Sequence, residues 1–380
     1  MSKPRAIFEE VSADAPRARA VRPGEAEAKR RRARRAIAGW LLLLAALVAA
    51  MVIVGGLTRL TDSGLSITEW QPVTGAMPPL SAEDWQVEFD KYRAIPEYQL
   101  QNRGMSLAEF QFIYWWEWGH RQFGRIIGLV WAVGFAWFLA RRMIPPGWTW
   151  KLVLPGALGG VQGFIGWWMV SSGLTGTMLD VASYRLATHL GLAFVILGLL
   201  LHYAWQLGRD PADLLVARRH RLPGPRRFGQ LVLAVLFAQI LMGALVAGID
   251  AGRGYIDWPL MGGEWIPSEA LAYTPMWSNF FENPALVQFN HRILGYLAVL
   301  LGLAWAIRCR YARHSGLRLW SGLVALGMLG QTALGVATVM HAAPLEWAIA
   351  HQGGALILWA LTLRAVFETG WPSEERIART

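Results

Sequence analysis

The stretch YWWEWGHRQFGR, residues 114–125, brings an acid, a histidine and two arginines to the start of a long apolar segment. Glu117 and His120 are three residues apart, so on a helix they share one face. Arg121 follows directly and could either snorkel to a membrane surface or bind an anionic ligand. Such a group can combine proton transfer with the binding of a metal or cofactor.

Three other histidines occupy comparable positions. The motif His-Arg-x-x-Gly starts at His120 and again at His291, and the motif His-x-Gly-x-Ala starts at His189 and again at His351. Each of the four lies at the edge of an apolar segment, where an ionisable residue is usually functional. Two imidazoles that face each other across a helix bundle suit a haem iron, whereas zinc normally takes more ligands, with carboxylates or thiolates among them. We therefore predict these four residues as haem ligands.

One substitution distinguishes the two His-Arg motifs. Glu117 stands three residues before His120, whereas Gln288 stands three residues before His291. The two side chains are nearly isosteric, but only glutamate can release a proton. This difference suggests that one copy carries out chemistry while the other holds a stable cofactor. The alternative is that Glu117 is an interfacial acid paired with Arg121 or Arg125.

The elements that must position these residues are membrane helices. The chain is 54% hydrophobic with 21 tryptophans, and a spanning helix needs about 20 mostly apolar residues. Eight segments meet this requirement: 36–58, 121–140, 152–171, 186–207, 228–249, 286–307, 318–340 and 346–367.

The eight segments form two copies of a four-helix unit. At a constant offset of 188, seven residues recur: Gly55, Leu57, Asp62, Gly64, Trp70, Gly75 and Pro79 match Gly243, Leu245, Asp250, Gly252, Trp258, Gly263 and Pro267. The two histidine motifs and the pair Gln162-x-x-x-Gly166 and Gln331-x-x-x-Gly335 follow in the same order. A unit of four spanning helices returns the chain to the side on which it started, so both copies have the same orientation in the membrane. The sequence thus predicts an all-α integral membrane protein built from two parallel four-helix bundles.

This repeat defines the expected domains. Residues 36–207 and 228–367 form the two halves, joined by a basic cytoplasmic linker at 208–227 and flanked by a disordered basic tail at 1–35 and a short tail at 368–380. The offset falls from 188 to 171 between the first two matches, so the first outer loop, about 62–115, is longer than its counterpart at 250–285.

Lysine and arginine gather in the predicted tail, in the linker and in the loops on the same side. Such residues stay on the cytoplasmic side, so we expect both termini to be cytoplasmic and the net charge of +10 to reflect topology rather than nucleic-acid binding. Acidic residues within the first 35 positions argue against a mitochondrial transit peptide. Cys309 is the only cysteine, which excludes an internal disulfide and a thiolate cluster.

The stretches TRLTDSGLSITEWQPVTGAMPP and EWGHRQFGR, the paired histidine motifs and the eight-helix layout resemble the haem A synthase family, over residues 36–367. The resemblance implies a membrane oxidoreductase that converts haem O to haem A for cytochrome oxidase. It implies two successive oxygenations of one porphyrin methyl group, with oxygen from O2 or water, giving a gem-diol that loses water. It further implies a bound haem B and an external electron donor, for which a ferredoxin-like protein is the candidate.

The same resemblance assigns roles to residues. His120 and His189 match the pair associated with the substrate haem, His291 and His351 match the pair that holds haem B, and Glu117 matches the family's essential glutamate. From the residues themselves, Arg121 and Arg292 could bind haem propionates or snorkel to the membrane surface. The first outer loop has no cysteine pair, so the chain resembles the cysteine-free class of mitochondria and related bacteria, which implies the bacterial inner membrane as its location. A haem O-forming farnesyltransferase is an expected partner besides the lipid bilayer.

Two other classes remain open from the residues. A di-haem cytochrome b that only transfers electrons would explain the four histidines but not the difference between Glu117 and Gln288. A transporter is suggested by the parallel repeat, but it would normally contain helices broken at mid-membrane. His341 ends the seventh segment without a histidine counterpart, since Ser172 occupies the equivalent position, and it could lie near the pocket.

Overall fold

The computed structural model describes residues 23–176 and 178–373, which form helices joined by loops. Within these ranges eight helices are long and apolar enough to span a membrane, which confirms the prediction of an all-α, multi-pass membrane protein. They are α1 (Pro23–Leu60), α4 (Leu107–Ala140), α5 (Thr149–Val170), α6 (Ser183–Gly208), α8 (Pro223–Gly248), α10 (Pro284–Cys309), α11 (Ser315–Met340) and α12 (Leu345–Gly370).

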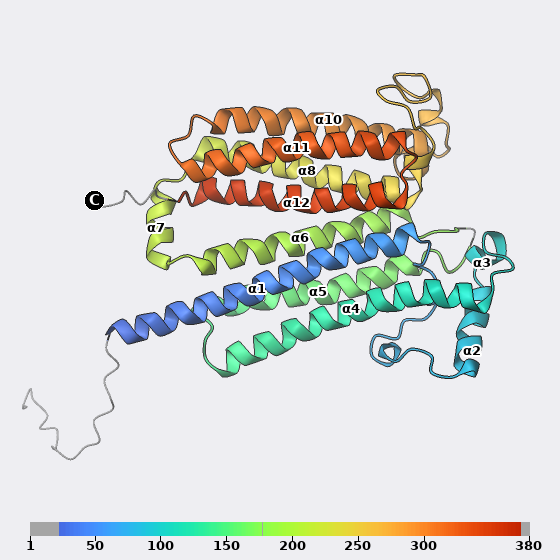
Figure 1. Ribbon diagram of the computed structural model, residues 1–380, viewed down its shortest axis with the longest axis horizontal. Helices are drawn as coiled ribbons and strands as arrows, with labels where there is room; N and C mark the ends of the chain where they lie inside the picture. Colours follow the sequence, from blue (N-terminus) through green and yellow to red (C-terminus); the bar gives the residue numbers. More distant parts are fainter. Residues whose placement is uncertain (1–22, 177, 374–380) are drawn as a thin grey trace, which may run out of the picture.

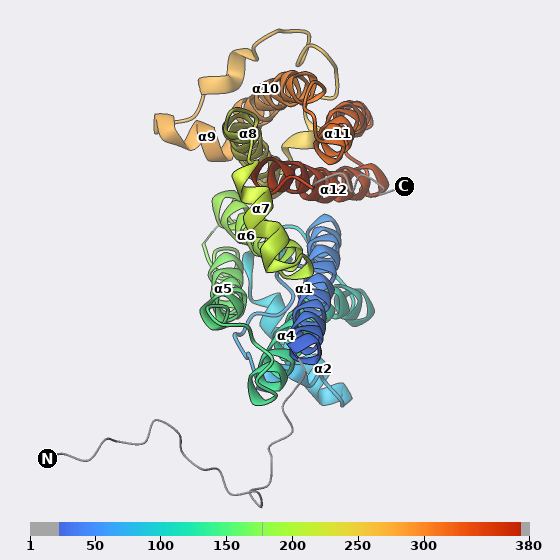
Figure 2. The same cartoon turned by 90° about the vertical axis from the view of Figure 1, so that its left-hand side faces the viewer.

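The eight long helices form two four-helix bundles that lie side by side (Figure 1, Figure 2). In the first half, α1 and α5 each pack against both α4 and α6, so α4 and α6 lie on a diagonal. In the second half, α8 and α11 each pack against α10 and α12, which lie on the equivalent diagonal. The halves meet where α6 packs against α8 and α1 against α12. Both predicted histidine pairs therefore lie on diagonal helices.

The start of α1 corrects the expected tail. Residues 23–35 continue α1 as helix, so the prediction of disorder is wrong for them, while residues 1–22 lie outside the described residues. Alanine, glutamate and arginine dominate this stretch and favour helix. Arg34 also donates hydrogen bonds to the backbone carbonyls of Gln206 and Arg209 at 2.9 and 3.1 Å. These contacts fix the end of α1 against the end of α6.

The linker is also more ordered than expected. It contains the short helix α7 (Pro211–Arg219), whose N-cap Asp210 accepts a hydrogen bond from the Ala212 backbone N–H. Proline at the first helical position is pre-organised for a helix start. A proline at the same position lets α8 begin at Pro223, five residues before the expected boundary.

The first outer loop is shorter than predicted, because α4 begins at Leu107 and not near residue 121. Ser106 and Glu109 form a capping box that starts the helix. Phe110, on the added turns, stacks against Phe89 and Tyr92 with ring centroids 5.0 and 5.3 Å apart. Aromatic packing thus extends α4 beyond the membrane segment.

Short helices cap both bundles at the end opposite the start of α1 and the end of α12, which we call the loop end. The first loop holds η1 (Thr74–Ala76), α2 (Ala82–Arg93) and α3 (Pro96–Leu100), and the second holds η2 (Ala251–Arg253), η3 (Ser268–Leu271), η4 (Met276–Ser278) and α9 (Asn279–Glu282).

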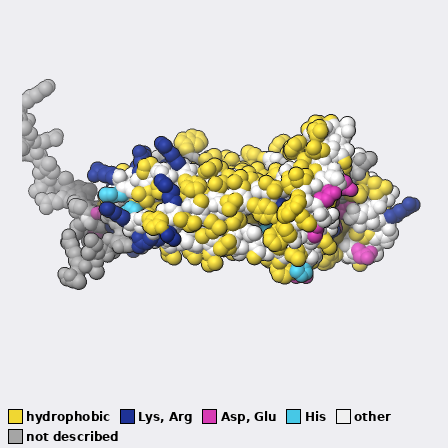
Figure 3. Space-filling view, turned by 90° about the horizontal axis from the view of Figure 1, so that it is seen from above, with side chains coloured by type: hydrophobic (Ala, Val, Ile, Leu, Met, Phe, Trp, Pro, Cys, Tyr) yellow, Lys and Arg dark blue, Asp and Glu magenta, His cyan; other side chains and the backbone are white. Residues whose placement is uncertain are grey.

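The surface has three zones (Figure 3). Apolar side chains cover the middle, including Leu129 and Val133 on α4, which are 63% and 61% exposed and suited to lipid. Lysine and arginine gather at the end opposite the loop end, and acidic side chains appear at the loop end. This distribution supports the predicted orientation, which remains a prediction.

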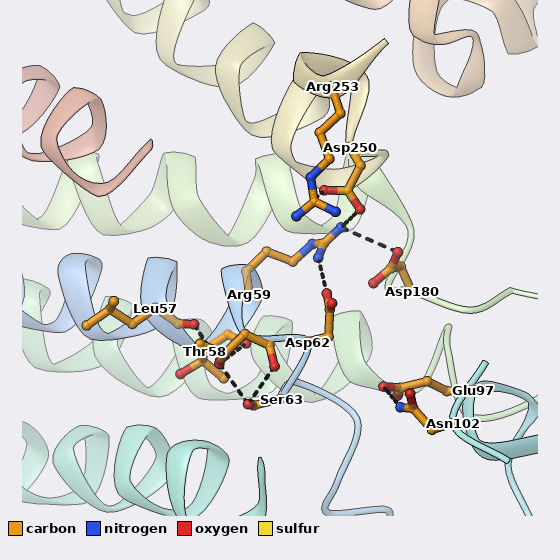
Figure 4. Close-up of polar contacts among 11 residues, drawn as sticks. Leu57, Thr58, Arg59, Asp62, Ser63, Glu97, Asn102, Asp180, Asp250 and Arg253 are labelled. Carbon is orange, nitrogen blue, oxygen red and sulfur yellow. Dashed lines mark hydrogen bonds and ion pairs between the residues drawn. The ribbon is translucent and has the colours of Figure 1, made fainter. Parts of the chain in front are cut away.

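Arg59, at the end of α1, joins the two halves at the loop end (Figure 4). Its guanidinium lies 3.0 Å from Asp62, 3.1 Å from Asp250 and 3.4 Å from Asp180. Asp62 and Asp250 are equivalent in the repeat, and both adopt a left-handed backbone with φ of 48° and 51°. The repeat counterpart of Arg59 is Ala247. One cation therefore binds the equivalent turns of both halves.

Arg59→Leu is expected to lower stability by about 1–2 kcal/mol, because three carboxylates would face one another without a buried cation. Thermal unfolding in detergent measures the change. Arg253→Leu is the matched control, since Arg253 is half-exposed and lies 3.7 Å from Asp250. Equal stability losses in the two variants would contradict the role of Arg59.

A second charged residue, Glu97 on α3, is buried beneath the first outer loop and is 3% exposed. Its Oε1 accepts a hydrogen bond from Asn102 at 3.3 Å, and its Oε2 has no partner among the described residues. Burial, with the nearby charges of Asp180 and Asp62, raises the pKa of Glu97 to about 8. The carboxyl group is therefore mostly protonated at neutral pH.

The folded pKa of Glu97 lies above its ordinary value of 4.5, so the folded protein retains a proton that the unfolded chain has released. Stability is therefore expected to fall as pH rises from about 4.5 to about 8. Glu97→Gln should reduce this fall, because the amide resembles the protonated acid. Thermal unfolding at about pH 6 and about pH 8.5 tests it. An unchanged pH dependence in the variant would disprove the contribution of Glu97.

Candidate functional site

The four predicted ligands lie toward the loop end of their helices. His189, His291 and His351 each stand about two turns from the start of α6, α10 and α12. His120 lies deeper within α4, because that helix begins at Leu107. The prediction that all four histidines begin their helices is therefore wrong for His120. All four still fall on the diagonal helices of their own bundles.

Two of the histidines pack against the first helix of their own half. A Cβ atom added at Gly55 on α1 would lie 3.4 Å from His120 Nε2. One added at the repeat-equivalent Gly243 on α8 would lie 3.1 Å from His291 Cε1. Any larger residue at Gly243 would push against the imidazole.

The other two histidines repeat this arrangement on the third helix of each half. A Cβ atom at Gly166 on α5 would lie 2.9 Å from His189 Cε1, and one at Gly335 on α11 would lie 2.9 Å from His351 Cε1. Four equivalent glycines therefore make room for four equivalent imidazoles. The sequence analysis found these glycines as parts of the repeat but assigned them no role.

The geometry of the second-half pair fits a bis-histidine haem. The ring centroids of His291 and His351 are 6.5 Å apart with planes at 78°, a spacing that leaves space for one metal ion about 2 Å from a nitrogen of each ring. Nδ1 of His291 is buried without a hydrogen-bond partner, as is Nδ1 of His189 in the first half. Within residues 23–176 and 178–373, no three His, Cys, Asp or Glu side chains form a metal site. Two ligands per site suit haem iron.

Glutamines hold the histidine backbone in both halves. Gln162 Nε2 donates to the His189 carbonyl at 2.9 Å, and Gln331 Nε2 donates to the His351 carbonyl at 2.8 Å. A further glutamine, Gln239, places its Nε2 3.3 Å from His291 Nε2. Its position was not singled out from the sequence, although its repeat counterpart is the apolar Met51.

Glu117 is buried, with only 2% of its surface exposed, and four donors converge on its carboxylate. Oε2 accepts hydrogen bonds from the Ser66 hydroxyl and the Ile67 backbone N–H, both at 2.7 Å. Oε1 accepts from Arg121 Nε at 3.0 Å and Nη2 at 2.6 Å. Donors alone surround the group, as an ionised carboxylate requires. The ion pair with Arg121, which the sequence offered as the alternative to a catalytic role for Glu117, is therefore present.

Glu117 joins α4 to the first outer loop. No hydrogen bond between Glu117 and His120 occurs in the described part of the chain, although the two residues are one helical turn apart. A cavity of about 250 Å³ adjoins this junction and is lined in part by Ile67, Tyr114, Arg121 and Arg125. The cavity provides space next to two of the groups that bind Glu117.

Gln288 occupies the equivalent position in the second half, but it donates a hydrogen bond to the outer loop where Glu117 accepts one. Its Nε2 donates to the Tyr255 carbonyl at 3.2 Å, and its Oε1 accepts from Arg292 at 3.2 Å. Tyr255 is the repeat counterpart of Ile67, so the same loop position contributes an N–H in the first half and a C=O in the second. Ser66 has Gly254 as its counterpart. The Glu/Gln difference therefore matches a difference in the loop that it contacts.

The arginines that follow the ligands bind the outer loops. Arg121 donates to the carbonyls of Ile67 and Glu69, at 2.8 and 3.1 Å. Arg292 donates to the equivalent carbonyls of Tyr255 and Asp257, both at 2.9 Å.

The loop contacts bear on the predicted binding of haem propionates, which remains a prediction. Arg292 also donates to the Leu260 carbonyl and to Gln288, so its terminal nitrogens already have four acceptors. Its Nε is buried without a hydrogen-bond partner within the described residues and is the donor left for a further acceptor.

His341 lies apart from these sites. It is exposed, its Nδ1 lies 2.7 Å from the Ala337 carbonyl, and its ring stacks on Trp347 with centroids 5.4 Å apart. These contacts account for it as a residue of the α11 C-terminus.

Comparison with known proteins agrees with this geometry. Residues 38–363 match the COX15-CtaA family, described as cytochrome oxidase assembly protein. A protein of Dinoroseobacter shibae named "Heme A synthase" is 61% identical over 373 residues, covering 98% of this chain and 97% of its own.

Two further relatives carry the same name. The protein of Ruegeria sp. (strain TM1040) is 56% identical over 372 residues, covering 97% of each chain. The protein of Paracoccus denitrificans is 53% identical over 379 residues, covering 99% of each chain. The family match includes six of the membrane helices in full, most of α1 and α12, and both histidine pairs. The chain therefore belongs to the COX15-CtaA family of cytochrome oxidase assembly proteins.

Proposed function

We propose that this protein is an oxidoreductase that converts haem O to haem A by oxidising the C8 methyl group to a formyl group. The observation that carries the proposal is the buried Glu117 carboxylate, one turn from His120, which only one of the two similar ligand sets has. The names of the relatives support the reaction. An electron-transfer protein with two equivalent haems would have no need for this difference.

The two halves have different roles in this proposal. His291 and His351 hold haem B as a resident group, and His120 and His189 bind the substrate haem O. The 6.5 Å spacing of the second-half imidazoles supports ligation from both sides of one iron. The glycines opposite the four histidines support an equivalent site in the first half.

The bound haem supplies redox chemistry at iron. Conversion of the methyl to a formyl group adds one oxygen atom, removes two hydrogen atoms and is a four-electron oxidation of carbon. With O2 as the oxidant, each of two oxygenations consumes one O2, two electrons and two protons and releases one water. The resulting gem-diol then loses a third water. An external donor must supply these electrons, and we propose a ferredoxin-like protein. If the oxygen came from water, the electrons would instead leave the site.

Glu117 contributes a carboxylate, ion-paired with Arg121, at the edge of the first-half site. Its contacts with Ser66, Ile67 and Arg121 hold the carboxylate rigidly, so it can stabilise positive character at the oxidised carbon without reorganisation. The adjoining cavity beside Arg121 gives space through which water and protons can exchange. Arg121 and Arg292 hold the outer loops over their sites, which excludes bulk water.

The surrounding proteins and membrane follow from the same proposal. We place the chain in the bacterial inner membrane with both termini in the cytoplasm, which the basic end opposite the loop end supports. The loop end and both ligand sets then lie near the outer face. A farnesyltransferase that forms haem O is a suitable partner, because haem O is too apolar to diffuse freely through water.

Glu117→Gln is expected to retain haem but to lower haem A formation by at least tenfold, because an amide cannot carry the charge and would place a donor against other donors. Haem extraction followed by chromatography measures both quantities. Gln288→Glu is the reciprocal control, which should disturb the second-half haem without removing the first-half carboxylate. Normal haem A yield from Glu117→Gln would rule out the catalytic role.

Gly335→Val is expected to cut the haem content of the second half by more than half, because the added side chain would displace His351. The absorbance spectrum and haem-to-protein ratio test this. Gly330→Ala on the same helix is the control, since a Cβ there meets nothing within 4 Å. Equal haem content in both variants would contradict the role of Gly335.

A further inference from the structure

The His-x-Gly motifs connect each ligand site to the other half. The glycine two residues after His189 is Gly191, where an added Cβ would lie 2.6 Å from Leu241 Cδ2 on α8. The glycine two residues after His351 is Gly353, where an added Cβ atom would lie 3.7 Å from Ile53 Cδ1 on α1. Leu241 and Ile53 are 188 residues apart and equivalent in the repeat. The interface between the halves therefore has approximate two-fold symmetry.

The residue between histidine and glycine breaks this symmetry. It is Leu190 in the first half and Gln352 in the second. Leu190 packs in an apolar cluster that includes Ala244 on α8. Gln352 instead donates a hydrogen bond of 2.6 Å from Nε2 to the Val52 carbonyl on α1. One side of the interface is apolar, and the other contains a polar bond between the halves.

The helices that face these two residues, α1 and α8, also differ at equivalent positions. Gly56 on α1 is the repeat counterpart of Ala244, and a Cβ atom at Gly56 would overlap the amide of Gln352. The interface thus pairs alanine with leucine on one side and glycine with glutamine on the other. Both members of the second pair are needed for the hydrogen bond, which indicates that the bond is a specific feature of this interface.

The bond links the two ligand sets through residues next to their histidines. Gln352 follows His351, a predicted ligand of the second half. Its acceptor Val52 lies on the same short stretch of α1 as Gly55, which packs against His120 of the first half. The Gln352 side chain is half-buried and Val52 is buried, and a partly desolvated amide loses free energy when it is unpaired, so the two helix segments are expected to move together.

We infer that Gln352 is a positioning residue that couples the two haem sites, so that occupation of the first-half site alters the environment of the second-half haem. This inference rests on the proposed function, because it requires a haem in each half. Coupling of this kind is reciprocal: binding at either site changes the free energy of the other.

The test compares protein purified from hosts that do and do not make haem O. The midpoint potential of the second-half haem is measured by redox titration in each preparation. In the wild type, the two preparations are expected to differ in midpoint potential. In Gln352→Leu, which gives the second motif the leucine of the first, this difference should fall by more than half. Leu190→Gln is the matched control and should keep the full difference.

Gly56→Ala gives an independent check, because its methyl group would displace the Gln352 amide without changing that residue. It should reduce the difference as Gln352→Leu does. A wild type without any difference, or a full difference in both interface variants, would overturn the coupling. Haem content separates the two proposals: protein that binds no haem O or haem A in a producing host overturns the proposed function, and the coupling with it.

Discussion

Close contact between four glycines and four histidines is the constraint on which both sites depend. Imidazoles on diagonal helices can face one another only if the intervening helices leave space near the bundle axis. Gly166 and Gly335 provide that space, since even a methyl group would lie 2.9 Å from the imidazole. The remaining architecture, with two rings of four helices in the same orientation, places this contact at equivalent positions twice.

Function then arises from departures from the repeat. Glu117 replaces a glutamine where the loop offers N–H and O–H donors instead of a carbonyl, so the first half carries a buried charge that the second lacks. Arg59 has the uncharged Ala247 as its counterpart, and it binds Asp62 and Asp250 in the equivalent turns of the two halves. Gln352 is a third departure, at the interface. Duplication provides two similar sites, and a few polar substitutions give them different tasks.

Much of this organisation could be predicted from the sequence, because apolar length and a constant offset both report on helices directly. The four histidines were identified by the same repeat. The extension of α4 was missed, since it depends on aromatic packing of Phe110 against Phe89 and Tyr92 from a distant loop segment. The contacts of Glu117 with Ser66 and Ile67 likewise join residues about 50 positions apart, which helical spacing cannot reveal.

Identification of the bound haems tests the central claim most directly. The protein would be purified from a host that makes haem O, its haems extracted in acid, and the extract separated by chromatography with mass detection. The account predicts haem B together with haem A or hydroxylated haem O, one resident and one in the course of oxidation. Haem B alone, from a host shown to contain haem O, would contradict it and favour a protein that only transfers electrons.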